Sequence, residues 1–441
     1  MKTDRENTGF IFDTLHDAGH EVYLVGGCVR DLAALRPVHD YDFTTDALPD
    51  EMIRIFGEEN IIPTGLRHGT VTVLHNNSSF EITTYRTDGD YSDHRRPDNV
   101  RFASTLEEDL SRRDFTMNAL AMDKNGNITD LFGGCADLEN GVLRCVGDPY
   151  ERFDEDALRI LRALRFASVY ELSIEEKTAA AMHEKKSLLR FVSEERISSE
   201  LRRFVMGNNA CDTALAFSDV LAEIIPEFAP CIGFDQKSIY HRYDVFSHMM
   251  HAMGSSTANE YVRLALFLHD IEKPSCAVFD SSGHGHFKGH EPKSAETAHA
   301  VMRRLKFDTR TIDTVCSLIG NHHIRPADDR YFVKKLISLM GYDMFLLQCE
   351  VLIGDNSAKN DKALVRIELT EKMKAIAADV KAKGECCSLS GLSVNGNDLL
   401  GAGLKGKEIG DMLDRLLDRV MDGSAENEHD ALMELVRGTC R

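Results

Sequence analysis

Two adjacent glycines, Gly26 and Gly27, constrain the first part of this 441-residue chain more than any other feature. They follow a short apolar run, residues 22–25, which predicts a buried strand, and they precede a helical pattern. Glycines let the backbone approach a ligand closely and leave amide N–H groups free to hold phosphate oxygens. The stretch therefore predicts a strand, a phosphate-binding turn and a helix whose first turn carries Arg30 and Asp31.

Two carboxylates, Asp40 and Asp42, flank Tyr41 about a dozen residues further on. If this segment is a strand, both carboxylates point to one face of it and Tyr41 points away. Adjacent carboxylates repel each other unless a cation lies between them, and hard oxygen ligands suit Mg²⁺. Each feature alone is more often structural, but together they indicate metal-assisted phosphoryl transfer, with Glu81 as a candidate third carboxylate.

The residues that follow predict a small α+β domain. Helical patterns cover 9–20 and 48–56, and two alternating stretches, 67–75 and 78–88, predict strands joined by a turn at Asn76 and Asn77. The polar and basic segment 89–102 is expected to be a mobile loop.

A basic cluster comes next, at residues 112–118. Arg112, Arg113, Asp114 and Asn118 stand there among apolar residues. Arg113 has the geometry to hold a triphosphate through two hydrogen bonds, which Lys does less well. A surface ion pair is the alternative.

Residues 148–167 carry the periodicity of one amphipathic helix. Its apolar face comprises Ala157, Ile160, Leu161, Ala163, Leu164 and Ala167, and its charged face comprises Asp156, Arg159, Arg162 and Arg165. A solvated surface is the usual explanation of such a charged face. However, cytosine and adenine both present an amine donor beside a ring-nitrogen acceptor, whereas uracil and guanine present the reverse. Asp156, which only accepts, and Arg159, which only donates, therefore match C and A, with Arg162 and Arg165 toward the base or the phosphates.

Composition sets looser limits. The length suggests about three domains, and no apolar run approaches the ~20 residues of a membrane span. Eleven cysteines without a CxxC pair, and an N-terminus without a secretory signal, predict reduced thiols and a cytoplasmic protein. A net charge of −20 argues against a nucleic-acid partner, although a local basic cleft is compatible with it.

Four motifs resemble one family. GGCVRD, DYD, RRDFTMNA and EDALR are similar to those of the class II tRNA nucleotidyltransferases, the CCA-adding enzymes and bacterial poly(A) polymerases of the polymerase β superfamily. The resemblance implies that Asp40 and Asp42 are catalytic and bind Mg²⁺, and that Asp156 and Arg159 serve as a protein template. The nucleotide-binding residues that it implies are Gly26, Gly27, Arg30, Arg113, Asp114, Asn118, Asp156, Arg159, Arg162 and Arg165. In the helix predicted for 193–207, Glu195, Arg196 and Glu200 are expected to brace the template helix.

The second half resembles another superfamily in part. His248, His269-Asp270, His290, His322 and Asp355 follow the order of the HD metal-dependent phosphohydrolases. That resemblance implies one divalent transition metal (Mn, Ni, Co, Fe or Zn) on His248, His269, Asp270 and Asp355. His290 and His322 are then ligands of a second metal or contacts of a scissile phosphate. Whether such a site is active or vestigial stays open.

Residues 392–436 resemble the C-terminal segment of the nucleotidyltransferases, with Lys405 and Lys407 as candidate RNA contacts. The expected fold is therefore α+β, with a polymerase-β-like head (1–146), a helical neck (147–232), an HD-type body (233–360) and a helical tRNA-binding tail (361–441). The expected activity is addition of C, C and A to the tRNA 3′ end from CTP and ATP. Alternatives are A-only or CC-only addition, poly(A) synthesis, or chiefly an HD phosphohydrolase; the expected protein is a monomer or homodimer, away from membranes.

Overall fold

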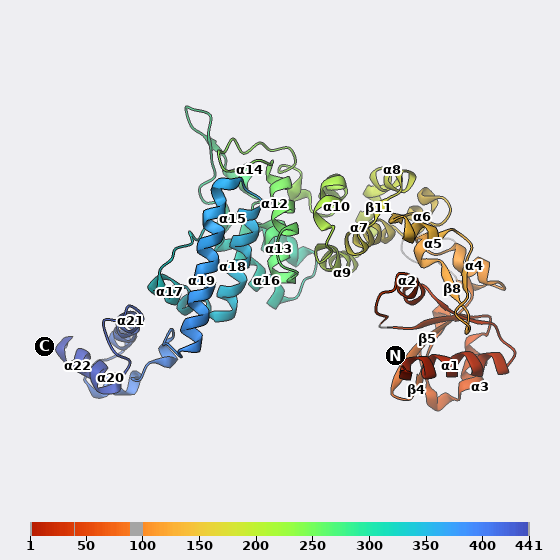
Figure 1. The fold of residues 1–441 in the computed structure, drawn as a ribbon, viewed down its shortest axis with the longest axis horizontal. Coiled ribbons are helices and arrows are strands. Elements are labelled where there is room, and N and C mark those ends of the chain that lie inside the picture. The colour runs from red at the N-terminus through yellow and green to blue at the C-terminus, as the bar shows by residue number, and fades with distance from the viewer. Residues whose placement is uncertain (1, 39, 89–99, 440–441) are drawn as a thin grey trace. The chain divides into compact units, whose positions relative to one another are not determined.

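A computed structural model describes residues 2–38, 40–88 and 100–439 (Figure 1). The chain forms two compact units, residues 1–229 and 230–441, and each is treated by itself below. Most of the predicted mobile loop, residues 89–99, lies outside the described residues. Its end, which was also predicted as loop, forms strand β7 (Val100–Phe102), because this segment pairs with β6 (Arg86–Asp88). The division into head, neck, body and tail stays a prediction.

A seven-stranded sheet is the frame of the first unit. Its strand order is β3-β4-β5-β2-β1-β8-β9. The strands are β1 (Val22–Val25), β2 (Asp42–Thr45), β3 (Ile61–Gly65), β4 (Thr70–His75), β5 (Ser78–Thr84), β8 (Leu120–Met122) and β9 (Ile128–Asp130). The helices around it are α1 (Lys2–Asp17), α2 (Gly27–Ala33), α3 (Pro49–Phe56), α4 (Leu106–Ser111) and α5 (Gly134–Glu139). Apolar side chains of α1, α3 and the sheet form one buried core, so the sheet is rigidly supported beneath the glycine turn.

The predicted strand–turn–helix and hairpin are both confirmed. Asn76 and Asn77 connect the antiparallel strands β4 and β5 with φ of 49° and 60°, the left-handed pair typical of a two-residue hairpin.

The prediction that Asp40 and Tyr41 belong to a strand is wrong, because β2 begins at Asp42. Strand β1 ends at Val25 and Gly26 turns away with a φ of 70°. The antiparallel pairing of β1 with β2 runs from Val22 opposite Thr45 to Leu24 opposite Phe43, so the ladder ends beside Asp42.

The neck lies within the same unit. Its elements are α6 (Pro149–Glu155), α7 (Leu158–Tyr170), α8 (Glu176–Lys185), α9 (Glu194–Val205), α10 (Ala210–Ala216) and α11 (Ser218–Ile224), with β10 (Val142–Leu143) pairing β11 (Ser173–Ile174). The expected single helix over 148–167 is wrong, because the chain breaks at Asp156, whose φ and ψ are −136° and 103°. The Asp156 carboxylate accepts the N–H of Leu158 at 3.1 Å, so it caps the helix that follows. The predicted apolar face of α7 is confirmed, since all six of its residues are buried.

The second unit is helical. Its main elements are α12 (Val245–Gly254), α13 (Glu260–Leu268), α14 (Lys273–Cys276), α15 (His290–Arg304), α16 (Thr309–Gly320), α17 (Arg330–Met340), α18 (Tyr342–Ser357) and α19 (Leu364–Ala382). A hairpin of β12 (Val278–Phe279) and β13 (Gly285–His286) precedes α15. Helices α20 (Gly396–Gly401), α21 (Lys407–Met421) and α22 (His429–Thr439) enclose a core of their own. Helices α12, α13, α16 and α18 pack on one another (Figure 1).

No single helix among the described residues is long and apolar enough to cross a membrane, whereas the bent pair α17 and α18 passes that test by length and composition.

Candidate functional site

The glycine turn lies under an arginine. A Cβ added to Gly26 would come within 3.0 Å of Nη1 of Arg113, and the φ of +70° at Gly26 is itself unfavourable for other residues. Arg113 also pairs with Asp109, with 3.1 Å between Nη2 and Oδ2. One guanidinium therefore covers the predicted phosphate-binding turn.

Asp109 is a residue that the sequence analysis missed. Its side chain is fully buried and holds both Arg112, at 2.7 Å, and Arg113. Burial works to raise the pKa of this carboxyl, but the two guanidinium groups outweigh burial and lower the pKa below its usual value. The i, i+3 and i, i+4 spacing from Asp109 to the two arginines was the signal that would have found it.

The carboxylates of the head gather on neighbouring strands. Asp42 lies directly opposite Glu81 in the parallel pair β2–β5, and Asp40 precedes β2. Burial, then repulsion from Glu81 and from Asp40, raise the pKa of Asp42, although Arg113 works against them. The predicted third carboxylate is therefore beside the pair.

Arg30 connects the glycine turn to helix α7. Its Nη1 donates to Oδ1 of Asn118 at 2.7 Å, its Nε donates to Asp31 at 3.0 Å, and Nη2 donates to the hydroxyl of Tyr170. Tyr170 in turn donates to Asp31 at 2.9 Å, and its ring lies 4.3 Å from the Arg30 guanidinium carbon. Arg30 is thus bound to protein groups, and Tyr170 is a second residue that sequence reasoning missed.

A second link joins the head to the same helix. Asn118 donates to Asp114 at 2.9 Å, and Asp114 accepts Nε and Nη2 of Arg162 at 2.7 and 2.5 Å. Burial works to raise the pKa of Asp114, but Arg162 and Asn118 lower it to about 2. Asp114 is therefore ionised at neutral pH, and α7 is held to the head through both Tyr170 and Arg162.

The predicted base-selecting pair has partners within the protein. Asp156 accepts Nη2 of Arg196 at 2.9 Å. Arg159 is buried, donates to Glu155 at 2.6 Å and to the Arg112 carbonyl at 2.9 Å. The charged face is therefore a set of ion pairs between elements, and a freely solvated surface is excluded for it.

Of the three residues of α9 that were expected to brace the template helix, two form ion pairs with it or with the residue that caps it. Arg196 binds Asp156, and Glu200 lies 2.8 Å from Nε of Arg165. Burial first lowers the pKa of Arg165, to about 10, while Glu200 raises it. Glu195, the third bracing candidate, is exposed in the first turn of α9.

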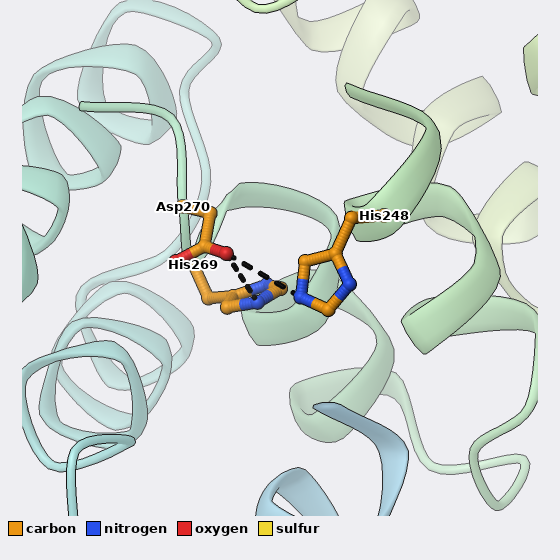
Figure 2. Close-up of side chains that lie close together, drawn as sticks. All are labelled: His248, His269 and Asp270. Carbon is orange, nitrogen blue, oxygen red and sulfur yellow. Dashed lines mark ion pairs between the residues drawn. The ribbon is translucent and has the colours of Figure 1, made fainter. Parts of the chain in front are cut away.

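In the second unit, all six predicted ligands converge on one centre. His248 comes from α12, His269 and Asp270 follow α13, His290 begins α15, His322 follows α16, and Asp355 belongs to α18. Figure 2 shows His248, His269 and Asp270 facing one another, with Oδ2 of Asp270 3.4 and 3.2 Å from the two Nε2 atoms. Asp355 Oδ1 lies 3.0 Å from Nε2 of His248.

Asp270 is shared between two groups. Its Oδ2 faces His248 and His269, and its Oδ1 lies 3.1 Å from Nε2 of His290 and 3.5 Å from Nε2 of His322. Each set places one ligand atom per residue within 4.8 Å of the others. Such a bridging carboxylate is suited to two adjacent divalent ions.

Three imidazoles are held in one tautomer. Nδ1 of His269, His290 and His322 lies 2.8, 2.6 and 2.6 Å from a backbone carbonyl oxygen, which only accepts, so each Nδ1 carries the proton. Each Nε2 then points a lone pair at the centre, and those of His290 and His322 are 3.1 Å apart. Within the described chain, Nε2 of His269 and both oxygens of Asp270 have no hydrogen bond of acceptable geometry, although Nζ of Lys273 forms an ion pair with Oδ2 of Asp270. Converging lone pairs of this kind fit a metal centre.

Lys405 and Lys407 are exposed, the first in the loop before α21 and the second at its start. Their role as RNA contacts stays a prediction.

Models of known protein families match residues in both units. A family model of the poly(A) polymerase head domain matches residues 22–144, a model of the RNA- and SrmB-binding site of polymerase A matches 171–232, and a model of tRNA nucleotidyltransferase domain 2 matches 292–436. A CCA-adding enzyme of Enterococcus faecalis is 31% identical over 421 residues, which are 95% of this chain and 92% of that protein. The chain belongs to the family of the CCA-adding enzymes. The shared architecture is thus a polymerase-β-like head followed by helices.

Other relatives match in part. The CCA-adding enzyme of Lactobacillus helveticus is 51% identical over 220 residues, so the match spans 50% of this chain and 55% of that relative. A crystal structure of the Bacillus stearothermophilus CCA-adding enzyme in complex with CTP is 26% identical, with a TM-score of 0.74 over 100% of this chain and 98% of that one. The Thermotoga maritima CCA-adding enzyme complexed with tRNA, 19% identical with a TM-score of 0.61 over 98% and 94% of the two chains, shares the fold.

Proposed function

We propose that this protein is a tRNA nucleotidyltransferase that adds C, C and A to the tRNA 3′ end from CTP and ATP without a nucleic-acid template. The observation that carries the proposal is the position of Arg113 over the Gly26 turn, within electrostatic reach of Asp42. A triphosphate and a carboxylate-bound cation are then neighbours, as nucleotidyl transfer requires. The names of the relatives, and the CTP and tRNA in solved structures of the family, support the same substrates.

Asp40 and Asp42 would hold Mg²⁺, with Glu81 beside them. Desolvation, and then repulsion from Glu81 and Asp40, raise the pKa of Asp42, which fits a site that a cation stabilises. When bound, Mg²⁺ lowers the pKa of the attacking 3′-hydroxyl and neutralises triphosphate charge.

The other residues of the head bind and orient the nucleotide. The Gly26–Gly27 turn offers backbone amides to the phosphates, and Arg113 offers a planar donor pair. Arg30 and Asn118 act through each other and through Tyr170 and Asp114, since their hydrogen bonds keep α7 at a fixed position beside the turn.

Base selection falls to Asp156 and Arg159. Each has a protein partner at present, Arg196 and Glu155 respectively. A bound C or A therefore exchanges these contacts for hydrogen bonds to its own pairing edge, whereas U or G offers donors and acceptors in the wrong order. Addition of A alone, addition of CC alone, and poly(A) synthesis use the same chemistry and are outcomes of the test.

The test uses purified protein, a tRNA transcript that ends before CCA, and labelled CTP or ATP with and without Mg²⁺. We expect incorporation that requires Mg²⁺ and is specific for C and A. Equal incorporation of UTP or GTP, or incorporation unaffected by a chelator, would contradict the proposal.

A second candidate function is metal-dependent phosphate release at the His/Asp centre. The converging lone pairs of His290 and His322, 3.1 Å apart beside Asp270, favour it. A divalent transition metal on His248, His269, Asp270 and Asp355, with His290 and His322 at a second position, would supply an activated water.

To test this candidate, an Asp42→Ala protein, inactive in nucleotide addition, is given 2′-phosphorylated or cyclic nucleotides with Mn²⁺ or Ni²⁺. Phosphate release that Asp270→Asn abolishes in the same background supports the candidate. Equal release by both proteins rules it out.

A further inference from the structure

Two lysines with little exposed side chain lie inside the His/Asp centre. An ammonium group cannot serve as a metal ligand, so these lysines need another explanation. Nζ of Lys273 is 2.5 Å from Oδ2 of Asp270, and Nζ of Lys359 is 2.5 Å from Oδ2 of Asp355. Their side chains are 6% and 10% exposed. Both carboxylates that the metal proposal needs are therefore already neutralised by ammonium groups of this chain.

The carboxylates of the centre are balanced without any metal. Two carboxylates and two ammonium groups sum to zero, so the centre holds no surplus of negative charge. The half-buried Glu291 lies near the outer nitrogen of His290, with 3.6 Å between Oε2 and Nδ1, so it does not face the bridging oxygen of Asp270. Each divalent ion that enters would bring two uncompensated positive charges into a largely buried site, which is costly.

An anion that enters together with the metal removes that cost. A phosphate group carries up to two negative charges and accepts hydrogen bonds through several oxygens. Lys273 is also held by Gln236, with 3.0 Å between Nζ and Oε1. Lys359, on the turn after α18, is therefore the ammonium better able to change from a carboxylate partner to an anion.

We propose that Lys359 and Lys273 make metal binding at this centre depend on a co-bound phosphate-class anion, with Lys359 as the residue that contacts the anion. The inference rests on the metal-binding candidate above and extends it to an anion requirement. Inorganic phosphate and the phosphate monoester of a nucleotide share the required chemistry, so both are used as probes.

The experiment measures Mn²⁺ affinity by calorimetry and by the electron spin resonance of free Mn²⁺, on the full chain. Every protein carries Asp42→Asn, so that the contribution of the head is the same throughout. Titrations are made in chloride, in inorganic phosphate and in AMP. The variants are Lys359→Met, the charge-conserving Lys359→Arg and Asp270→Asn. The matched control is Lys362→Met, which removes an exposed lysine three residues from Lys359.

We expect phosphate or AMP to increase the Mn²⁺ affinity of the parent protein. The probe that gives the larger increase shows whether the centre prefers inorganic phosphate or the phosphate monoester of a nucleotide. Lys359→Met should bind Mn²⁺ more tightly in chloride, by about tenfold or more, because a nearby positive charge is gone. The same variant should lose most of the anion-dependent gain, whereas Lys359→Arg should retain it.

Two results are decisive against the idea and are distinguishable. If Lys359→Met behaves like Lys362→Met in all three solutions, the anion requirement is wrong while the metal site stands. If Asp270→Asn binds as much Mn²⁺ as the parent protein, the metal-binding candidate fails as well.

Discussion

We expect Asp42→Ala to abolish nucleotide addition and to leave the fold intact. The substitution removes a carboxylate that would hold Mg²⁺ directly opposite Glu81. Because such an ion supplies several kcal/mol of charge stabilisation, we expect kcat/KM to fall by roughly a thousandfold or more. The measurement is single-turnover addition of labelled C to a transcript that ends before CCA. The matched control is Asp50→Ala, which removes an exposed carboxylate from the same unit and should retain full activity.

Stability separates loss of catalysis from loss of fold. Because burial and repulsion from Glu81 and Asp40 raise the pKa of Asp42, its ionised form destabilises the folded state above the unfolded-state pKa of about 3.9. The isosteric Asp42→Asn protein should therefore melt no lower than the parent at pH 7 without Mg²⁺. Any increase in the melting temperature of Asp42→Asn over that of the parent should disappear as the pH falls to about 4 and below. Adding Mg²⁺ should raise the melting temperature of the parent more than that of the variant. Near-normal turnover by Asp42→Ala would overturn the assignment of the head.

Asp156→Asn weakens the choice of C and A over U and G. An amide both donates and accepts, so it satisfies a keto oxygen as well as an amine, whereas a carboxylate only accepts. Since one well-formed pair of hydrogen bonds contributes about 1–3 kcal/mol of discrimination, we expect the ratio of kcat/KM for CTP over UTP to fall roughly tenfold to a hundredfold. Rates are compared for all four nucleotides on the same transcript.

The control for selectivity is Asp154→Asn. Asp154 lies two residues away and pairs with Lys185 at 2.7 Å. It should leave the preference for C and A unchanged. Unaltered fidelity in Asp156→Asn would mean that the protein-template hypothesis is wrong, even if overall activity falls.

Local chemistry made much of the fold and site predictable. The glycine pair, the alternating strands and the Asn76-Asn77 turn specify their conformations through neighbouring residues, and the structure has them. The histidines and aspartates of the second unit were recognisable because their order along the chain is specific. Helix packing then brings them within a few ångströms of one another.

Features that depend on tertiary contacts were not predictable. The apolar periodicity of 148–167 continues through Asp156, but the side chain of Asp156 caps a new helix there and the backbone breaks. Tyr170 follows Arg30 by 140 residues, and only folding places its hydroxyl against Arg30 and Asp31. Lys359 stands four residues after Asp355, a spacing that permits an ion pair, but only folding places that pair beside the histidines.

The most direct test of the central claim counts the nucleotides added to three tRNA transcripts, ending before CCA, after CC, and complete. Each transcript is incubated with purified protein, Mg²⁺ and labelled CTP, ATP or both, and the products are resolved at single-nucleotide resolution. The proposed function predicts three additions, one addition and none, respectively, with C before A. A long A tract, addition of only one kind of nucleotide, or no incorporation on any transcript would contradict CCA addition by this chain.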